Sequence, residues 1–480
     1  MRAQNRSGLI RTGLTVTFLS LLLNGCLTSD EESEPEPQSQ SQTAVDAELE
    51  ESNEVTGSVG DGPIVGAAMR ILRNDGVELL KANSGSTATF NVVVKTKGKY
   101  YPLSIEATSG TDLVTNAAPD FKLHSAVLEP GKKSTANVNP FSTFAVELAG
   151  HLPGGANKTN LVTALGIVSS EFNNGLTSLA TSGSMNTKID SSNIAEIVRA
   201  SEALGETVRR TRDALGASGF AASGDSVVRA LAADLTDTVV DGRGGPGSDA
   251  RFAAVWNIVS AQVLLETMAN ELHVGGSDAT QLMSDAIAAV SNSSAGPGLA
   301  DLTVTSEMIE RARTGLVAAH AVTSDPGIAD LLDAMAGIRA GVGSATVRNS
   351  ALPGDYRYRL DNAVLLAAGG SATTLDTVND TSRTRTQTII TGPGVSSVAL
   401  NWAAPTQNED GSQLTDLAGY KIYWGTTPGC YPNSVTINDP NTTAYVVDNL
   451  SPGTYEFVAT AFNTSNVESG YSSPATKVVQ

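Results

Sequence analysis

The sequence predicts a multidomain chain, in which an all-β sandwich is followed by an all-α helical array and then by a second β-sandwich. Three stretches lead to this fold class. Apolar and polar residues alternate between residues 55 and 150, apolar residues recur with helical spacing between 151 and 367, and the alternation returns between 395 and 480. Hydrophobic residues make up 40% of the 480 residues, which is enough for several packed cores.

Residues 1–25 have the layout of a signal peptide. Three arginines and no acidic residue precede an apolar run that begins at Leu14 and is too short to span a bilayer comfortably. The run ends in Leu23-Asn24-Gly25-Cys26, which resembles the lipobox of bacterial lipoproteins. This resemblance implies that the chain is cut before Cys26, that the Cys26 thiol carries a diacylglycerol, and that the new amino terminus receives an acyl chain such as palmitate. An ordinary secretory signal is the alternative.

The residues after Cys26 indicate a destination and a tether. In enteric lipoproteins an aspartate after the lipidated cysteine acts as an inner-membrane retention signal, and this chain has Leu27 there. We therefore expect a lipid anchor in the outer membrane, with the chain on the cell surface or on the periplasmic face. Residues 29–54 contain ten acidic residues and no basic one, so residues 26–54 are expected to form an acidic, disordered tether.

Net charge and cysteine content narrow the possible partners. A formal net charge of −19 at pH 7 disfavours binding to nucleic acid and to anionic lipid head groups. Cys430 is the only cysteine besides Cys26, so no intramolecular disulfide can form once Cys26 is lipidated. The expected partners are the membrane, through the amino-terminal lipid, and an extracellular protein or glycan. No cofactor is expected, and the sequence leaves the oligomeric state open.

The first β-sandwich is expected over residues 55–150. Phe90, Val92 and Val94 alternate with polar residues, and the dipeptide Asp75-Gly76 is typical of a turn. The opening Gly-x-Val-x-Asp-Gly-Pro-Ile-x-Gly-Ala, which begins at Gly57, resembles that of carboxypeptidase-regulatory-like β-sandwich domains in bacterial surface proteins. That resemblance implies a structural or binding domain without catalysis.

Residues 151–367 are expected to form six to eight antiparallel helices that act as a scaffold. Apolar stripes such as Ile197, Leu204 and Val208 recur with helical spacing, and Gly- and Ser-rich breaks separate them. No metal site is expected, because the region from 158 to 367 offers two histidines and no cysteine. The alternative is a carboxylate-only site for calcium or magnesium, for which the acidic, Gly-rich loop around residues 237–249 is the candidate.

The carboxy-terminal part contains the clearest fold pattern. Residues 368–394, rich in Thr, Ser and Gly, are expected to form a linker. In residues 395–480, Trp402 ends one alternating run, and the turn Leu450-Ser451-Pro452-Gly453-Thr454 leads into Tyr455. These residues resemble a fibronectin type III domain, an immunoglobulin-like sandwich, in which Trp402 corresponds to the core tryptophan and Tyr455 to the corner tyrosine.

No motif predicts a catalytic centre. The sequence lacks Gly-x-Ser-x-Gly, His-Glu-x-x-His and a phosphate-binding loop. Exposed tyrosines could stack on sugar rings, and the candidates are Tyr100, Tyr101, Tyr423 and Tyr431. We therefore expect a non-catalytic lipoprotein that displays β-sandwich modules for adhesion or for protein or glycan binding. The alternatives are an accessory glycan-binding protein of an extracellular polysaccharide system and a hydrolase with its site among the helices.

Overall fold

The fold is described from a computed structural model. The predicted signal peptide, Cys26 and most of the predicted tether lie outside the described residues. Those are 50–172, 184–291, 299, 302–350, 352–391, 396–402, 404–408, 412–427, 429–440, 442, 444–450 and 453–479. Within this part of the chain, contacts divide the residues into two compact units. The larger contains residues 51–398 with 445–452, and the smaller contains residues 399–444 with 453–479.

The larger unit begins with strands, as the alternating pattern predicts. One sheet has the order β5-β1-β9, a second has the order β4-β3-β6-β8, and β2 pairs with β7. Alternate residues face the core: Phe90 and Val94 of β5 and Leu103 and Ile105 of β6 are buried. The strands are β1 Glu51–Ser58, β2 Ile64–Val65, β3 Ala68–Leu72, β4 Glu78–Asn83, β5 Thr89–Thr96, β6 Leu103–Thr108, β7 Thr111–Asp112, β8 Leu123–Val127 and β9 Lys133–Thr135.

The first strand starts earlier than the sequence indicates. Residues 51–54, expected in the tether, belong to β1 and pair with β5 from Glu51 opposite Thr96 onward. Asn53 is buried, and its Nδ2 atom donates to Ser134 Oγ at 2.9 Å. A polar residue is therefore accommodated inside the sheet because its hydrogen bond is satisfied there.

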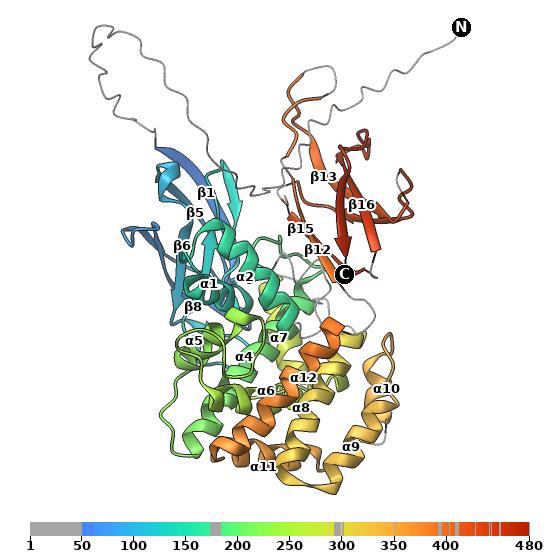
Figure 1. The fold of residues 1–480 in the computed structure, drawn as a ribbon. Helices are drawn as coiled ribbons and strands as arrows, with labels where there is room; N and C mark the ends of the chain where they lie inside the picture. Colours follow the sequence, from blue (N-terminus) through green and yellow to red (C-terminus); the bar gives the residue numbers. More distant parts are fainter. Residues whose placement is uncertain are drawn as a thin grey trace, which may run out of the picture. The chain divides into compact units, whose positions relative to one another are not determined.

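Helices follow, with α6 at their centre. Helix α6 packs against α4, α8, α11 and α12, and most of it is buried. Figure 1 shows these helices around α6. Within the described residues α6 is also the one helix long and apolar enough to cross a membrane, which a core helix of this length satisfies equally. The helices are α1 Pro140–His151, α2 Lys158–Glu171, α4 Ile194–Ala217, α5 Gly224–Asp234, α6 Ala250–Ala269, α7 Thr280–Val290, α8 Ser306–Thr323, α9 Pro326–Ala336, α10 Ser344–Asn349, α11 Tyr356–Ala368 and α12 Ala372–Thr391.

The strands and helices of the larger unit share one hydrophobic core. Asn139 caps α1 by accepting a hydrogen bond from the Ser142 amide, and Pro140 occupies the first turn. Helix α1 packs against β8 on one side and α2 on the other. Phe144 of α1 is fully buried, with its ring centroid 5.8 Å from that of Trp256 in α6. The boundary expected at residue 150 therefore falls inside a compact unit, at the end of α1.

The expected linker at residues 368–394 is largely a helix, so this prediction is wrong. Helix α12 spans Ala372–Thr391 and packs against α8 and α6. Leu375, Val378 and Ser382 are buried at spacings of three and four residues, which is one face of a helix. The Asn379 amide donates to the Ala250 carbonyl at 2.9 Å. Thr373, Thr377 and Thr384 lie on the exposed side of this helix.

The carboxy-terminal region consists of strands. Its four-stranded sheet has the order β14-β13-β16-β17, with every neighbouring pair antiparallel. Trp402 is buried as predicted, and its ring meets that of Tyr420 edge-on at 5.2 Å. The Tyr420 hydroxyl donates to the Pro440 carbonyl at 2.9 Å. The strands are β12 Ser396–Asn401, β13 Leu417–Gly425, β14 Asn433–Ile437, β15 Ala444–Leu450, β16 Gly453–Asn463 and β17 Ala475–Val479.

Candidate functional site

Helix α4 carries a buried row of charged side chains. Glu202, Glu206 and Arg209 recur at spacings of four and three residues, which places them on one face of the helix. All three are at least 94% buried. Charged residues are rarely buried to this extent without partners, so this face marks a specific site in the larger unit.

The strand region supplies two more carboxylates. Asp61 lies in the turn between β1 and β2, and its Oδ1 atom accepts a hydrogen bond from the Gly62 amide at 3.1 Å. Asp112 ends β7, where it lies opposite Ile64 of β2. Its two carboxylate oxygens accept from the Val114 amide at 2.8 Å and from the Thr115 hydroxyl at 2.7 Å. The β2–β7 pairing thus holds both aspartates beside each other.

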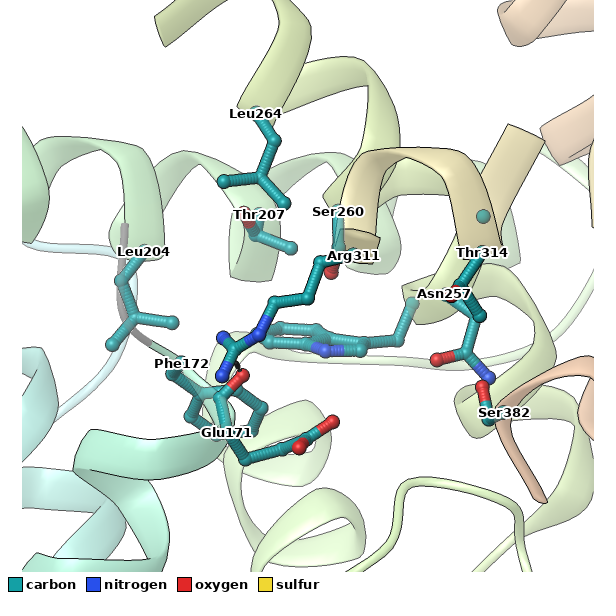
Figure 2. A pocket seen from close by; sticks show the side chains of 12 residues that line it. Glu171, Phe172, Leu204, Thr207, Asn257, Ser260, Leu264, Arg311, Thr314 and Ser382 are labelled. Atoms are coloured by element: carbon teal, nitrogen blue, oxygen red, sulfur yellow. Dashed lines mark hydrogen bonds between the residues drawn. The ribbon is translucent and has the colours of Figure 1, made fainter. Parts of the chain in front are cut away.

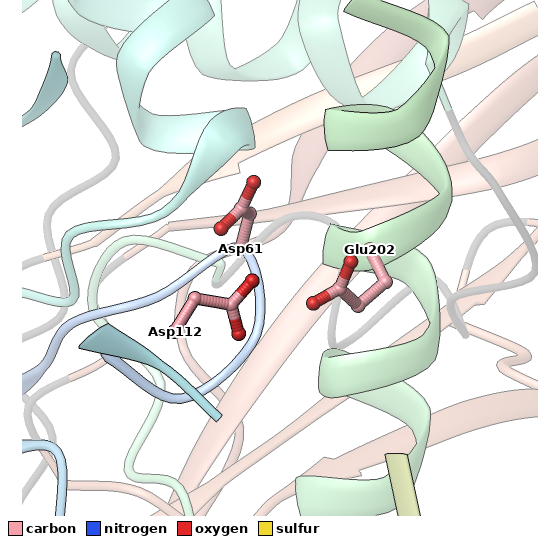
Figure 3. A group of neighbouring side chains, drawn as sticks. All are labelled: Asp61, Asp112 and Glu202. Atoms are coloured by element: carbon pink, nitrogen blue, oxygen red, sulfur yellow. The ribbon is translucent and has the colours of Figure 1, made fainter. Parts of the chain in front are cut away.

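Asp61, Asp112 and Glu202 converge, and we call them the carboxylate triad (Figure 3). One oxygen atom from each of the three lies within 4.8 Å of the others, and all three side chains are buried. The turn can approach α4 this closely because residue 62 is glycine. A Cβ atom at Gly62 would lie 2.3 Å from Glu202 Oε1 and 2.5 Å from Asp112 Oδ1.

Arg209 is the cation that contacts the triad. Its guanidinium donates to Asp61 at 2.9 Å, to Glu202 at 2.9 Å and to Glu206 at 2.8 Å. The next residue, Arg210, pairs with Glu206 and with the buried Glu266 of α6. A charge network therefore runs from the strand turns across α4 to α6.

The electrostatics of the triad favour added positive charge. Burial raises the pKa of Asp112 to about 6, and the negative charge of Asp61 adds to this effect. Burial and the nearby Asp112 raise the pKa of Glu202 well above its usual value. Burial works to lower the pKa of Arg209, but Asp61, Glu202 and Glu206 together raise it well above its usual value. The single guanidinium thus stays charged and still leaves the carboxylates repelling one another.

The structure brings two of the four predicted tyrosines together on the carboxy-terminal strands. Tyr423 and Tyr431 both pack against Tyr471, with ring centroids 5.2 and 5.5 Å away. Tyr471 is 55% exposed. The Tyr423 hydroxyl donates to Glu468, and the Tyr431 hydroxyl donates to Glu456 at 3.4 Å. We call these three rings the tyrosine cluster.

The other two predicted tyrosines do not join such a cluster. Tyr100 is half-buried, and the Arg73 guanidinium stacks on its ring at 3.2 Å from the centroid. The Tyr101 hydroxyl accepts a hydrogen bond from Asn53 at 3.3 Å. Cation–π packing and sheet hydrogen bonding therefore account for these two side chains.

The acidic loop after α5, the alternative calcium site, uses its carboxylates for the fold. Asp234 is buried and accepts from the amides of Asp241, Gly242 and Gly244 at 2.8, 2.8 and 3.0 Å. Asp249 caps α6 by accepting from the Arg251 amide at 2.8 Å. The loop geometry is thus explained without a cation.

A small cavity lies between α2, α4, α6 and α8. Its volume is about 40 Å³, enough for a few water molecules and too small for a sugar ring. Figure 2 shows Leu204, Phe172 and Arg311 among the side chains around it. The Arg311 guanidinium donates to the Glu171 carbonyl. This cavity does not provide a substrate site for the hydrolase alternative.

Sequence reasoning missed the carboxylate triad and Tyr471. The one local signal for the triad is the charged row Glu202, Glu206 and Arg209 on a helix that also carries an apolar stripe, whereas Asp61 and Asp112 look like ordinary turn residues. A comparison of the sequence with protein-family models and with curated proteins finds no match to either.

Proposed function

We propose that this chain is a non-catalytic lipoprotein of the bacterial outer membrane that binds glycan through the tyrosine cluster. The lipobox-like Leu23-Asn24-Gly25-Cys26 supports the anchor, and the acidic residues that follow support a tether. We further propose that the carboxy-terminal strands form a fibronectin type III-like sandwich. The buried Trp402 and the antiparallel order β14-β13-β16-β17 are consistent with that fold.

The observation that carries the proposal is the packing of the tyrosine cluster. The Tyr471 ring is inclined at 70° to that of Tyr423 and at 81° to that of Tyr431. Rings at these angles form a corner, where a sugar could stack on one ring face and touch the edge of another. The carboxylates of Glu456 and Glu468 beside the rings can accept hydrogen bonds from sugar hydroxyls.

The charges around the cluster favour a neutral or amino sugar. Lys421 pairs with Glu468 at 2.6 Å, so Lys421, Glu456 and Glu468 together carry one net negative charge. The whole chain has the same sign, at −19. An acidic polysaccharide would be repelled both by the local charge beside the tyrosine cluster and by the net charge of the chain.

The test is affinity electrophoresis of the full chain in nonionic detergent, through gels that contain laminarin or hydroxyethyl cellulose, which are both neutral glucans. We expect retardation of the wild-type chain and its loss in Tyr471→Ala. Tyr358→Ala is the matched control, because Tyr358 is 76% exposed on α11 in the other unit. The proposal fails if the polymers leave the migration of the wild-type chain unchanged, or if Tyr471→Ala is retarded as strongly as the wild type.

A further inference from the structure

We propose that Asp61, Asp112 and Glu202 bind one divalent cation, with calcium the best match, in the interior of the larger unit. The spacing of the triad fits a single ion. Calcium–oxygen distances are about 2.3–2.6 Å, so two oxygens on opposite sides of one ion lie about 5 Å apart. One oxygen from each triad residue lies within 4.8 Å of the other two, so a single ion can reach all three.

An unsatisfied oxygen points to the same conclusion. Glu202 is completely buried, and its Oε1 atom accepts no hydrogen bond from any described residue. The other oxygen, Oε2, accepts from Arg209 at 2.9 Å. Figure 3 shows the Glu202 carboxylate directed from α4 toward the two aspartates. A buried carboxylate oxygen without a partner is costly, and a cation between the three groups would satisfy it.

The charges around the triad also favour an added cation. Arg210 pairs with both Glu206 and Glu266, and Arg357 pairs with Glu266 at 3.3 Å and with Glu271 at 3.5 Å, so these two arginines are already shared among other carboxylates. The three triad carboxylates then face one guanidinium, that of Arg209. When the triad is ionised its carboxylates outnumber this guanidinium, and a divalent cation would offset the excess negative charge.

The donor atoms select the class of ion. All three side-chain ligands are carboxylates, which suit hard cations rather than zinc or copper. Magnesium demands a near-ideal octahedron, whereas calcium accepts irregular arrangements of six to eight oxygens. The triad comes from a turn, a strand end and a helix, so its geometry is set by the fold around it. The bound ion would join the Asp61 turn and β7 to α4 and so hold the strand region against the helices.

The first test measures the wild-type full chain in nonionic detergent at pH 7.5. After EDTA treatment and dialysis against calcium, we expect about one calcium ion per chain by plasma mass spectrometry. We also expect the melting temperature, followed by circular dichroism at 222 nm, to rise by roughly 3–5 °C at a calcium concentration 100-fold above Kd. An unchanged melting temperature with no retained calcium would overturn the proposal.

The second test uses Glu202→Gln, which keeps the side-chain shape and removes the charge. We expect this variant to lose the calcium-dependent rise in melting temperature. Asp237→Asn is the matched control in a different acidic loop, and it should keep the full response. If two triad carboxyls instead share a proton, calcium will not raise the melting temperature of either the wild type or Glu202→Gln. A calcium response that survives in Glu202→Gln would place the ion elsewhere. Both results would refute the site.

Discussion

Replacing Arg209 with methionine should strongly destabilise the larger unit. Methionine keeps the length of the aliphatic stem but removes the buried guanidinium, which bonds to Asp61, Glu202 and Glu206 at 2.8–2.9 Å. The carboxylates would then be buried without their cation. Removing one partner from a buried ion pair costs about 3–5 kcal/mol, so we expect a loss at least this large for Arg209→Met, measured without calcium.

The matched control is Arg212→Met on the same helix. Arg212 is 25% exposed, and it pairs with Asp120 and with the largely exposed Asp213. Ion pairs at the surface contribute about 0–1 kcal/mol, so this variant should lose little stability. The assay is urea unfolding of the full chain with EDTA, followed at 222 nm because the described helices lie in the larger unit. Equal unfolding midpoints for the two variants would refute the reasoning about the buried network.

Three further predictions concern other parts of the chain. Trp402→Ala should cost the carboxy-terminal strands about 3–5 kcal/mol, because it leaves a cavity beside Tyr420; a fluorescence melt within a degree or two of the wild type would contradict this. Cys26→Ala should abolish labelling by a palmitate analogue and release the chain from the outer-membrane fraction, and unchanged labelling would end the lipid-anchor hypothesis. Burial raises the pKa of Asp234 from 3.8 to about 6, so the folded chain holds this proton more tightly than the unfolded chain does. Its contribution to stability should therefore fall as the pH rises from 3.8 to about 6, and Asp234→Asn should make that decline shallower; identical pH slopes would contradict it.

The local patterns of the sequence predict most secondary structure. Alternation at Phe90 and Val94 marks β5, and the buried Ile197, Leu204 and Val208 mark α4. The helix count was too low: the described part of residues 151–367 contains nine α-helices, α2 and α4 to α11, against an expected six to eight. Short helices such as α10, Ser344–Asn349, contain too few turns to show a periodic stripe.

The linker prediction at α12 was wrong because it relied on amino-acid composition. Threonine and serine are typical of linkers, but α12 buries Leu375 and Val378 against neighbouring helices. The spacing of three residues between Leu375 and Val378 is compatible with a helix. This signal was weaker than the linker-like composition of the polar residues around them. Tertiary packing decided the outcome there.

The carboxylate triad could not be predicted from sequence alone. Asp61, Asp112 and Glu202 are brought together by the β2–β7 pairing and by the packing of α4, and both are long-range events. In a chain with 50 acidic residues, accidental combinations are too numerous to single out one. Tyr471 was missed for a similar reason, because its neighbours Tyr423 and Tyr431 lie 48 and 40 residues earlier in the chain.

The most direct test of the proposed function compares a neutral with an acidic polysaccharide. The full chain would be run through gels that contain either laminarin or polygalacturonate, at low and at high salt. We predict retardation by laminarin at both salt concentrations, because stacking on the tyrosine cluster is insensitive to salt, and no retardation by polygalacturonate at low salt. Equal retardation by both polymers, or retardation by polygalacturonate alone, would contradict the proposal that the tyrosine cluster binds neutral glycan.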